Sequence, residues 1–199
     1  MTTQQTEFPE PLLARLRAET RDEHAALERS VGLEAEPLDV STYLGWLVRF
    51  YGFYEPLERL IAAQLTPEAH GVDPAARRRA PLLAIDLISL GLDPSRVPLC
   101  GHLPVVGDPA DAFGCMYVLE GSTLGGQFIS RRIMRDLGMT PERGGRFFHG
   151  HGARTGEMWQ AFRDAISAFG ADHEQGQIVA AAVATFRSLR DWWEEGPTR

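Results

Sequence analysis

The sequence contains no lysine, so all 20 of its basic side chains are arginines, and its 27 acidic side chains leave a formal net charge of −7. Proteins that bind nucleic acid generally carry clustered positive charge, which this composition does not favour. A phosphate-binding loop of the Walker type is also excluded, because that motif requires a lysine before its serine or threonine. The sequence therefore argues against a general nucleic-acid partner and against a phosphate-binding glycine loop.

Cysteine and long apolar runs are also scarce. Cys100 and Cys115 are the only cysteines, and they fit no metal-ligand spacing. No apolar run approaches the roughly 20 residues that a membrane span needs. Met1 to Glu10 lacks the basic and then apolar pattern of a secretory signal. We expect a cytoplasmic protein with reduced thiols and no membrane span.

The pattern of apolar residues is helical throughout, with no strand-like alternation and no repeat, which predicts an all-α fold. The length of 199 residues suits one domain over 11–195, after a disordered segment 1–10 and before a short tail 196–199. We expect helices over about 9–30, 41–65, 74–90, 109–137, 155–169 and 172–194, with loops over 91–108 and 138–151. Proline is expected to kink or interrupt the second of these helices at Pro56 and to disturb the third at Pro81. The start of the last helix, 172–175, resembles a capping box.

The helix predicted over 109–137 is unusual because glycines interrupt it. Asp108 and Pro109 form a typical helix start, and Gly138 is a typical stop. Each glycine inside a helix costs roughly 1 kcal/mol relative to alanine, so a compensating use is expected. Gly114, Gly121 and Gly125 share one face, where bare backbone could receive either another helix or a flat ligand. The spacing alone leaves both interpretations open.

A histidine on the first predicted helix is the other candidate. His24 falls on the apolar stripe and is expected to point inward, either as a hydrogen-bonded core residue or as a metal ligand. Glu28 follows by four residues and could accept a hydrogen bond from the other ring nitrogen. Arg17 lies two turns before His24, as a ligand contact or as an ordinary surface residue.

Other sites have less support. The sequence has no Glu-x-x-His pair of the di-iron type and no His-Glu-x-x-His. His149 and His151 could chelate a metal, or could simply belong to a glycine-rich loop. Ser122 and Thr123 lack the surroundings of a serine nucleophile.

Two segments carry a resemblance to a known family. The segment from Leu16 to Glu28, LRAETRDEHAALE, resembles the first-helix signature of haem oxygenases. The segment from Tyr117 to Gln127, YVLEGSTLGGQ, resembles their glycine-rich distal helix, particularly in the bacterial branch whose members form biliverdin for phytochromes. The order of the two segments and the all-helical pattern agree over nearly the whole chain. The resemblance implies a haem oxygenase-like fold with haem b held between these two helices.

The resemblance also implies roles for individual residues. His24 would be the iron ligand with Glu28 as its hydrogen-bonding partner, and Arg17 and Arg163 would contact the haem propionates. Tyr117 would join them in binding haem, and the distal backbone and hydroxyl groups would come from these residues: Gly121, Ser122, Thr123, Gly125 and Gly126. Mammalian-type members have an aspartate where this chain has Ser122, so the resemblance does not identify the residue that anchors proton-delivering water.

The activity implied is oxidative cleavage of haem at a meso carbon to biliverdin, CO and ferrous iron. Electrons would come from an external ferredoxin or reductase, and a phytochrome is a candidate acceptor of the product. Arg131, Arg132 and Arg135 could form a docking patch for an acidic donor, or an ordinary solvated helix face. A non-catalytic haem-binding or haem-transfer protein on the same fold is the alternative function, and a helical bundle without haem is a third.

Overall fold

The computed structural model describes residues 12–33, 38–173 and 175–196, and within these it is built from helices without a strand. The α-helices are α1 Leu12–Val31, α2 Val40–Ala62, α3 Pro67–His70, α4 Ala80–Ser89, α5 Pro109–Leu137, α6 Arg146–His149, α7 Thr155–Ala171 and α8 Gln175–Glu194. Short 3-10 turns lie at Ala75–Arg77, Pro94–Arg96 and Gly152–Arg154. The predicted all-α fold is confirmed.

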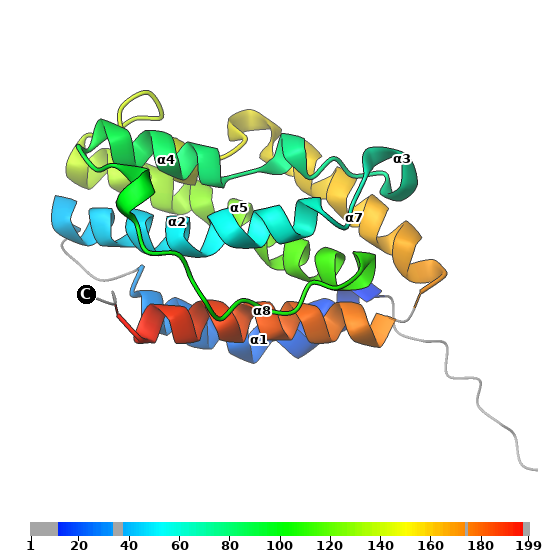
Figure 1. Ribbon diagram of the computed structural model, residues 1–199. Helices are drawn as coiled ribbons and strands as arrows, with labels where there is room; N and C mark the ends of the chain where they lie inside the picture. The colour runs from blue at the N-terminus through cyan, green and yellow to red at the C-terminus, as the bar shows by residue number, and fades with distance from the viewer. Residues whose placement is uncertain (1–11, 34–37, 174, 197–199) are drawn as a thin grey trace, which may run out of the picture.

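The long helix α5 runs through the middle of the molecule, between a layer formed by α1 and α8 and a layer formed by α2 and α4 (Figure 1). Helices α1 and α8 lie side by side and run in the same direction. Glu23 pairs with Arg187 and Arg190, and further along Ser30 donates a hydrogen bond to Glu194 at 2.6 Å. Because α8 packs against both α1 and α5, it fixes how these two helices face each other.

The bounds of α5 follow its sequence signals. The Asp108 carboxylate accepts hydrogen bonds from the backbone N–H groups of Ala110 and Asp111 at 2.9 and 3.0 Å, and Pro109 occupies the first turn. Gly138 ends the helix in the left-handed conformation, with φ of 64°. The predicted start and stop of this helix are therefore confirmed.

Two predicted helices differ from the structure. Pro56 lies inside α2, which continues to Ala62 without a break in its helical assignment. The helix expected over 74–90 is divided instead into a 3-10 turn, Ala75–Arg77, and α4, because Pro81 occupies the first turn of a new helix rather than the interior of an old one. The capping box expected at 172–175 includes residue 174, which lies outside the described residues.

One glycine of α5 serves close helix packing. A Cβ placed on Gly114 would lie 2.3 Å from the Ile178 carbonyl oxygen and 2.6 Å from the Cβ of Ala181, both on α8. No side chain fits in that space, so the helix-packing interpretation is correct for this position. Because Gly114 has no side chain, α8 packs closely against the N-terminal part of α5.

We expect Gly114→Ala to lower the free energy of unfolding by about 1–3 kcal/mol, the usual cost of overpacking, despite the better helix propensity of alanine. Urea unfolding followed by circular dichroism measures the change. Gly156→Ala on α7 is the matched control, because nothing lies within 4 Å of its added Cβ, and it should leave stability equal or slightly higher. Equal stabilities for the two variants would contradict the packing role of Gly114.

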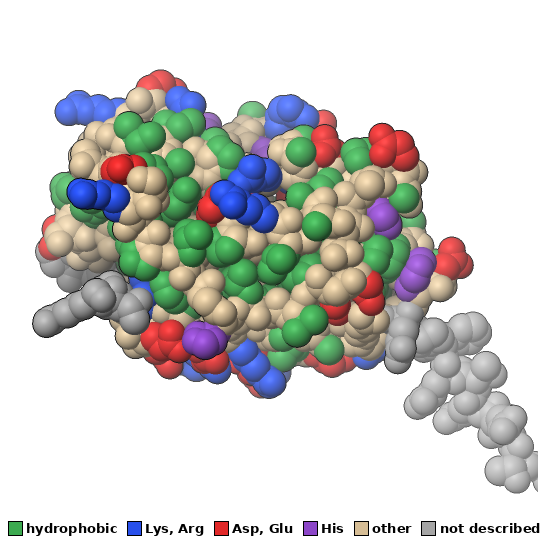
Figure 2. Space-filling model, viewed as in Figure 1, with side chains coloured by type: hydrophobic (Ala, Val, Ile, Leu, Met, Phe, Trp, Pro, Cys, Tyr) green, Lys and Arg blue, Asp and Glu red, His purple; other side chains and the backbone are tan. Residues whose placement is uncertain are grey.

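The surface is mixed in character. On the face seen in Figure 2, acidic and basic side chains are interspersed among apolar ones, without a broad basic patch among the described residues. Among those residues, too, every helix is either too short or too polar to cross a lipid bilayer.

Candidate functional site

Helices α1 and α5 touch at two places, and the stretch between these contacts, where His24 is exposed and little surrounds Gly121 and Gly125, is defined here as the opening. At one place, the Tyr117 hydroxyl of α5 lies near the side chain of Thr20 on α1, beside Arg17. Burial raises the pKa of the Tyr117 phenol, and Thr20 and the Arg17 charge offset part of that rise. At the other, Arg132 donates a hydrogen bond to the carbonyl of Leu33, just beyond the end of α1. The stretch of each helix between these contacts bounds the opening.

His24 and Gly121 lie at corresponding positions in this opening. Each follows its helix's contact residue by four positions, or about 6 Å along the helix axis. A Cβ placed on Gly121 would have one described heavy atom within 4 Å, the Cη2 of Trp159 at 3.9 Å. At Gly125, one turn later, no described atom lies that near apart from its chain neighbours and the backbone of its own helix. The α5 side of the opening is therefore bare backbone, opposite a histidine on α1.

The prediction that His24 points into the core is wrong, because 53% of its side chain is exposed. Leu16 and Thr20, on the same stripe, are buried, but at His24 the facing helix offers glycine and no covering side chain. The imidazole packs edge-on against Phe186 of α8, with ring centroids 5.5 Å apart. Its Nδ1 lies 3.7 Å from the Glu28 carboxylate, longer than a hydrogen bond.

Apolar side chains continue the glycine face of α5. Leu124 and Phe128, three and seven residues after Gly121, are 47% and 69% exposed. Large apolar side chains that are exposed next to a polar group often mark a surface that a ligand covers. A neutral imidazole can ligate a metal ion, and the bare backbone of α5 leaves room for a flat ring beside it.

A hydroxyl pair lies on the next face of α5. The Tyr54 hydroxyl is 3.0 Å from Ser122 Oγ, which in turn donates to the Leu119 carbonyl at 2.7 Å. Since the serine proton is used on Leu119, Tyr54 is the donor to Ser122. Burial raises the pKa of Tyr54, which keeps this donor protonated. No local sequence pattern indicates this role of Tyr54, because its partner lies 68 positions away.

A buried ion pair supports the glycine turn from behind. Glu120 accepts from Arg77 at 2.8 Å, and the same guanidinium nitrogen donates to the Met158 carbonyl of α7 at 3.1 Å. Burial raises the pKa of Glu120, and Arg77 and Arg79 oppose the rise. Beside the pair is a cavity of about 20 Å³, room for about one water molecule. Arg79 lines this cavity, and its Nε and Nη1 have no partner among the described residues.

Two expected distal residues lie away from the opening. A Cβ on Gly126 would be 2.9 Å from the Phe148 carbonyl oxygen, so this glycine admits the loop that contains α6. Thr123 is buried, and its hydroxyl donates to the Glu120 carbonyl. Residues 123 and 126 fall on the buried side of α5 because successive helix positions rotate by about 100°.

The arginines predicted from the sequence are divided among several environments. Arg17 is exposed beside Tyr117, and Arg163 is half-buried on α7, donating to Gln160 at 3.3 Å. Arg132 is buried and bonded to Asp136 and Leu33, so it does not belong to an exposed docking patch with Arg131 and Arg135.

The histidine pair His149 and His151 is not a chelate in this structure. His151 is half-buried, and its Nε2 has no partner among the described residues. Burial and the charges of Arg79, Arg77 and Arg154 lower its pKa. Within the described part of the chain, no group of three His, Cys, Asp or Glu side chains could hold a metal ion.

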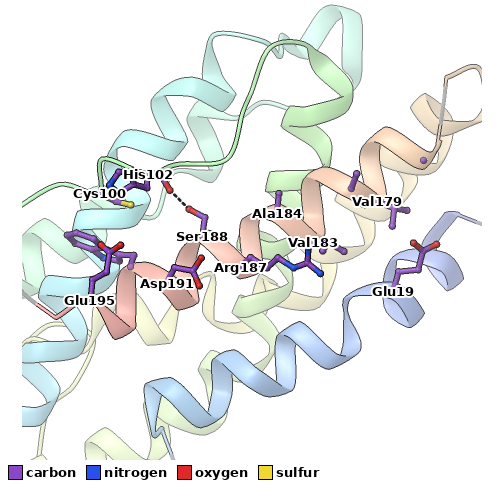
Figure 3. A pocket seen from close by; sticks show the side chains of 13 residues that line it. Glu19, Cys100, His102, Val179, Val183, Ala184, Arg187, Ser188, Asp191 and Glu195 are labelled. Atoms are coloured by element: carbon purple, nitrogen blue, oxygen red, sulfur yellow. Dashed lines mark hydrogen bonds between the residues drawn. The ribbon is translucent and has the colours of Figure 1, made fainter.

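A separate groove of about 700 Å³ follows the outer face of α8 (Figure 3). Small apolar side chains of α8 form its floor, with Cys100 and His102 on one wall and Glu19 of α1 on the other. None of the residues predicted from the sequence to bind a ligand lines it. The groove is therefore distinct from the opening between α1 and α5.

The fold and the opening define a helical protein that presents a histidine opposite a bare glycine face. The Heme oxygenase family model matches residues 98–195, which include the whole of α5, α6, α7 and α8. Over this segment the chain matches the haem oxygenase family.

Solved structures share the fold. Haem oxygenase of Neisseria meningitidis superposes with a TM-score of 0.75 at 23% identity, covering 93% of each chain. Haem oxygenase 2 of Chlamydomonas reinhardtii gives 0.75 at 20% identity, over 96% of this chain and 99% of that one. Haem oxygenase of Leptospira interrogans gives 0.74 at 22% identity, over 93% and 99%. A comparison with curated protein sequences gave no match. At these identities the structural likeness concerns the fold alone.

Proposed function

We propose that the chain is a haem oxygenase that binds haem between α1 and α5 and cleaves it at a meso carbon. The products are biliverdin, CO and ferrous iron, formed with O2 and with electrons from an external ferredoxin or reductase. The observation that carries the proposal is the exposed His24 opposite the bare Gly121 and Gly125 turns. A phytochrome that accepts biliverdin is a further candidate partner.

His24 would ligate the haem iron, and the Glu28 carboxylate, 3.7 Å from Nδ1, is near enough to accept a hydrogen bond from the ring after a small movement. Arg17, beside the Tyr117 hydroxyl, binds one propionate, and Arg163 binds the other. Guanidinium groups suit this task because their donors match the geometry of a carboxylate. The exposed side chains of Leu124 and Phe128 cover apolar parts of the ring.

Haem supplies the iron at which O2 is activated, and the chain's own groups direct the outcome. The glycine turns keep side chains out of the space above the ring, so small reactants fit there close to the backbone. Ser122 Oγ accepts from Tyr54 and donates to Leu119, which leaves it one acceptor position for an ordered water. Such a water, held at Ser122, donates protons into the reaction space.

The test is an absorption time course. The purified chain is mixed with haemin, and a reductant, oxygen and an iron chelator are then added. We expect a Soret complex that decays as the biliverdin spectrum grows. A Soret band that persists under turnover conditions would indicate a non-catalytic haem-binding protein, and failure to form any Soret complex would reject haem binding altogether.

A further inference from the structure

Trp159 lies against α5 at the Tyr117 end of the opening. Its Cη2 is the heavy atom found within 4 Å of a Cβ built on Gly121, and its ring centroid lies 5.9 Å from that of Tyr117. The indole therefore reaches the bare backbone that the proposed haem would cover. Arg163 follows one turn later on the same face of α7. Trp159 is thus a bulky group at the edge of the site, between the glycine face and a proposed propionate contact.

Packing and hydrogen bonds define the position of this indole. Phe162 stacks against it with ring centroids 5.8 Å apart and planes at 27°, and Phe162 is itself fully buried against Phe113. The turn that carries Trp159 is also tied to α5, because Arg77 bridges the Met158 carbonyl and the Glu120 carboxylate. Since Glu120 directly precedes Gly121, the indole and the glycine turn are held in fixed register.

An aromatic side chain at the edge of the site can restrict rotation of the haem in its own plane, which a histidine ligand does not restrict. Coordination by a histidine acts along the normal to the ring and leaves the haem free to rotate in its own plane. The side groups of haem make its meso carbons inequivalent, so this rotation decides which carbon faces the reaction space. Contacts at the ring edge must therefore set the rotation, and flexible arginines define it less sharply than a packed aromatic ring.

Building on the proposed function, we propose that Trp159 sets the in-plane orientation of the haem and thereby determines which meso carbon is cleaved. It is a positioning residue that acts through the seating of the substrate. Arg163 and Arg17 neutralise the propionates. Trp159 selects between in-plane orientations of the haem in which both propionates are equally well neutralised.

The experiment compares Trp159→Ala, Trp159→Phe and, as a control, Ser167→Ala, an exposed position further along α7. Biliverdin isomers are separated by chromatography after turnover. Independently of turnover, proton NMR of the ferric haem complex with added cyanide reports the seating through its haem methyl resonances. For Trp159→Ala we expect the ratio of the main isomer to the next to fall about fivefold to tenfold, the effect of losing one aromatic contact. A second set of methyl resonances should appear, while Trp159→Phe and Ser167→Ala resemble the wild type.

An unchanged isomer ratio together with a single set of methyl resonances in Trp159→Ala would overturn the inference and leave the proposed function intact. A wild type that itself gives mixed isomers and mixed resonances would overturn it as well. A wild type that binds haem in one seating but forms no biliverdin would reject the proposed function alone, and the NMR comparison would then decide the role of Trp159. Absence of haem binding would reject both.

Discussion

His24→Ala is expected to abolish biliverdin formation and to weaken haem binding by more than about 100-fold. Loss of a residue that only supports a metal ligand typically costs 10–100-fold in affinity, and loss of the ligand itself should cost more. A haemin titration followed at the Soret band measures the affinity, and the time course measures the product. Added imidazole should restore part of the Soret spectrum, because it can supply the missing nitrogen ligand.

The exposure of His24 makes this test specific. Since 53% of the side chain is exposed and its main contact is one edge-on ring, Phe186, removal should cost the apo protein no more than about 1 kcal/mol. His149→Ala is the matched control, because His149 is also exposed and lies in the loop that sequence reasoning considered as an alternative metal site. If His149→Ala lost haem binding while His24→Ala still bound haem, the haem site would lie in that loop instead.

The parts of the fold that local sequence determines could be predicted. Asp108, Pro109 and Gly138 mark the ends of α5 by capping chemistry that needs no tertiary partner. The helix over 74–90 could not be predicted as it is, because Pro81 can disturb a helix or begin one, and only the surrounding packing decides between the two.

For the candidate site, the sequence indicates which residues to consider but not the direction in which their side chains point. The apolar stripe that includes Leu16 and Thr20 predicted a buried His24. His24 is exposed because the facing helix has Gly121 at this level and therefore no side chain to cover it. The contacts that support the site join residues far apart in the chain, such as Tyr54 with Ser122 and Arg77 with Glu120. Neither pair has a local pattern that could have revealed it.

Substitutions at the adjacent glycines Gly125 and Gly126 should have opposite effects: one should reduce turnover and keep apo stability, and the other should reduce apo stability and keep haem binding. A Cβ on Gly125 meets no described atom within 4 Å, whereas a Cβ on Gly126 would lie 2.9 Å from the Phe148 carbonyl oxygen. We expect Gly125→Leu to raise apo stability by up to about 1 kcal/mol, since leucine is the better helix former. The same leucine would occupy the space opposite α1, so biliverdin formation should fall by at least about 100-fold.

Gly126→Ala is expected to do the reverse, because its added methyl group must displace backbone rather than enter open space. Apo stability should fall by about 1–3 kcal/mol, the usual cost of overpacking, while haem binding by the folded fraction persists. Thermal unfolding of both apo variants, followed by haemin titration and the time course at a temperature where each is folded, separates the two effects. Undiminished turnover in Gly125→Leu would show that this face is not where haem reacts. If Gly125→Leu instead unfolded like Gly126→Ala, the side of α5 that faces α1 would be packed in solution rather than open, and the two neighbouring glycines would share a structural role.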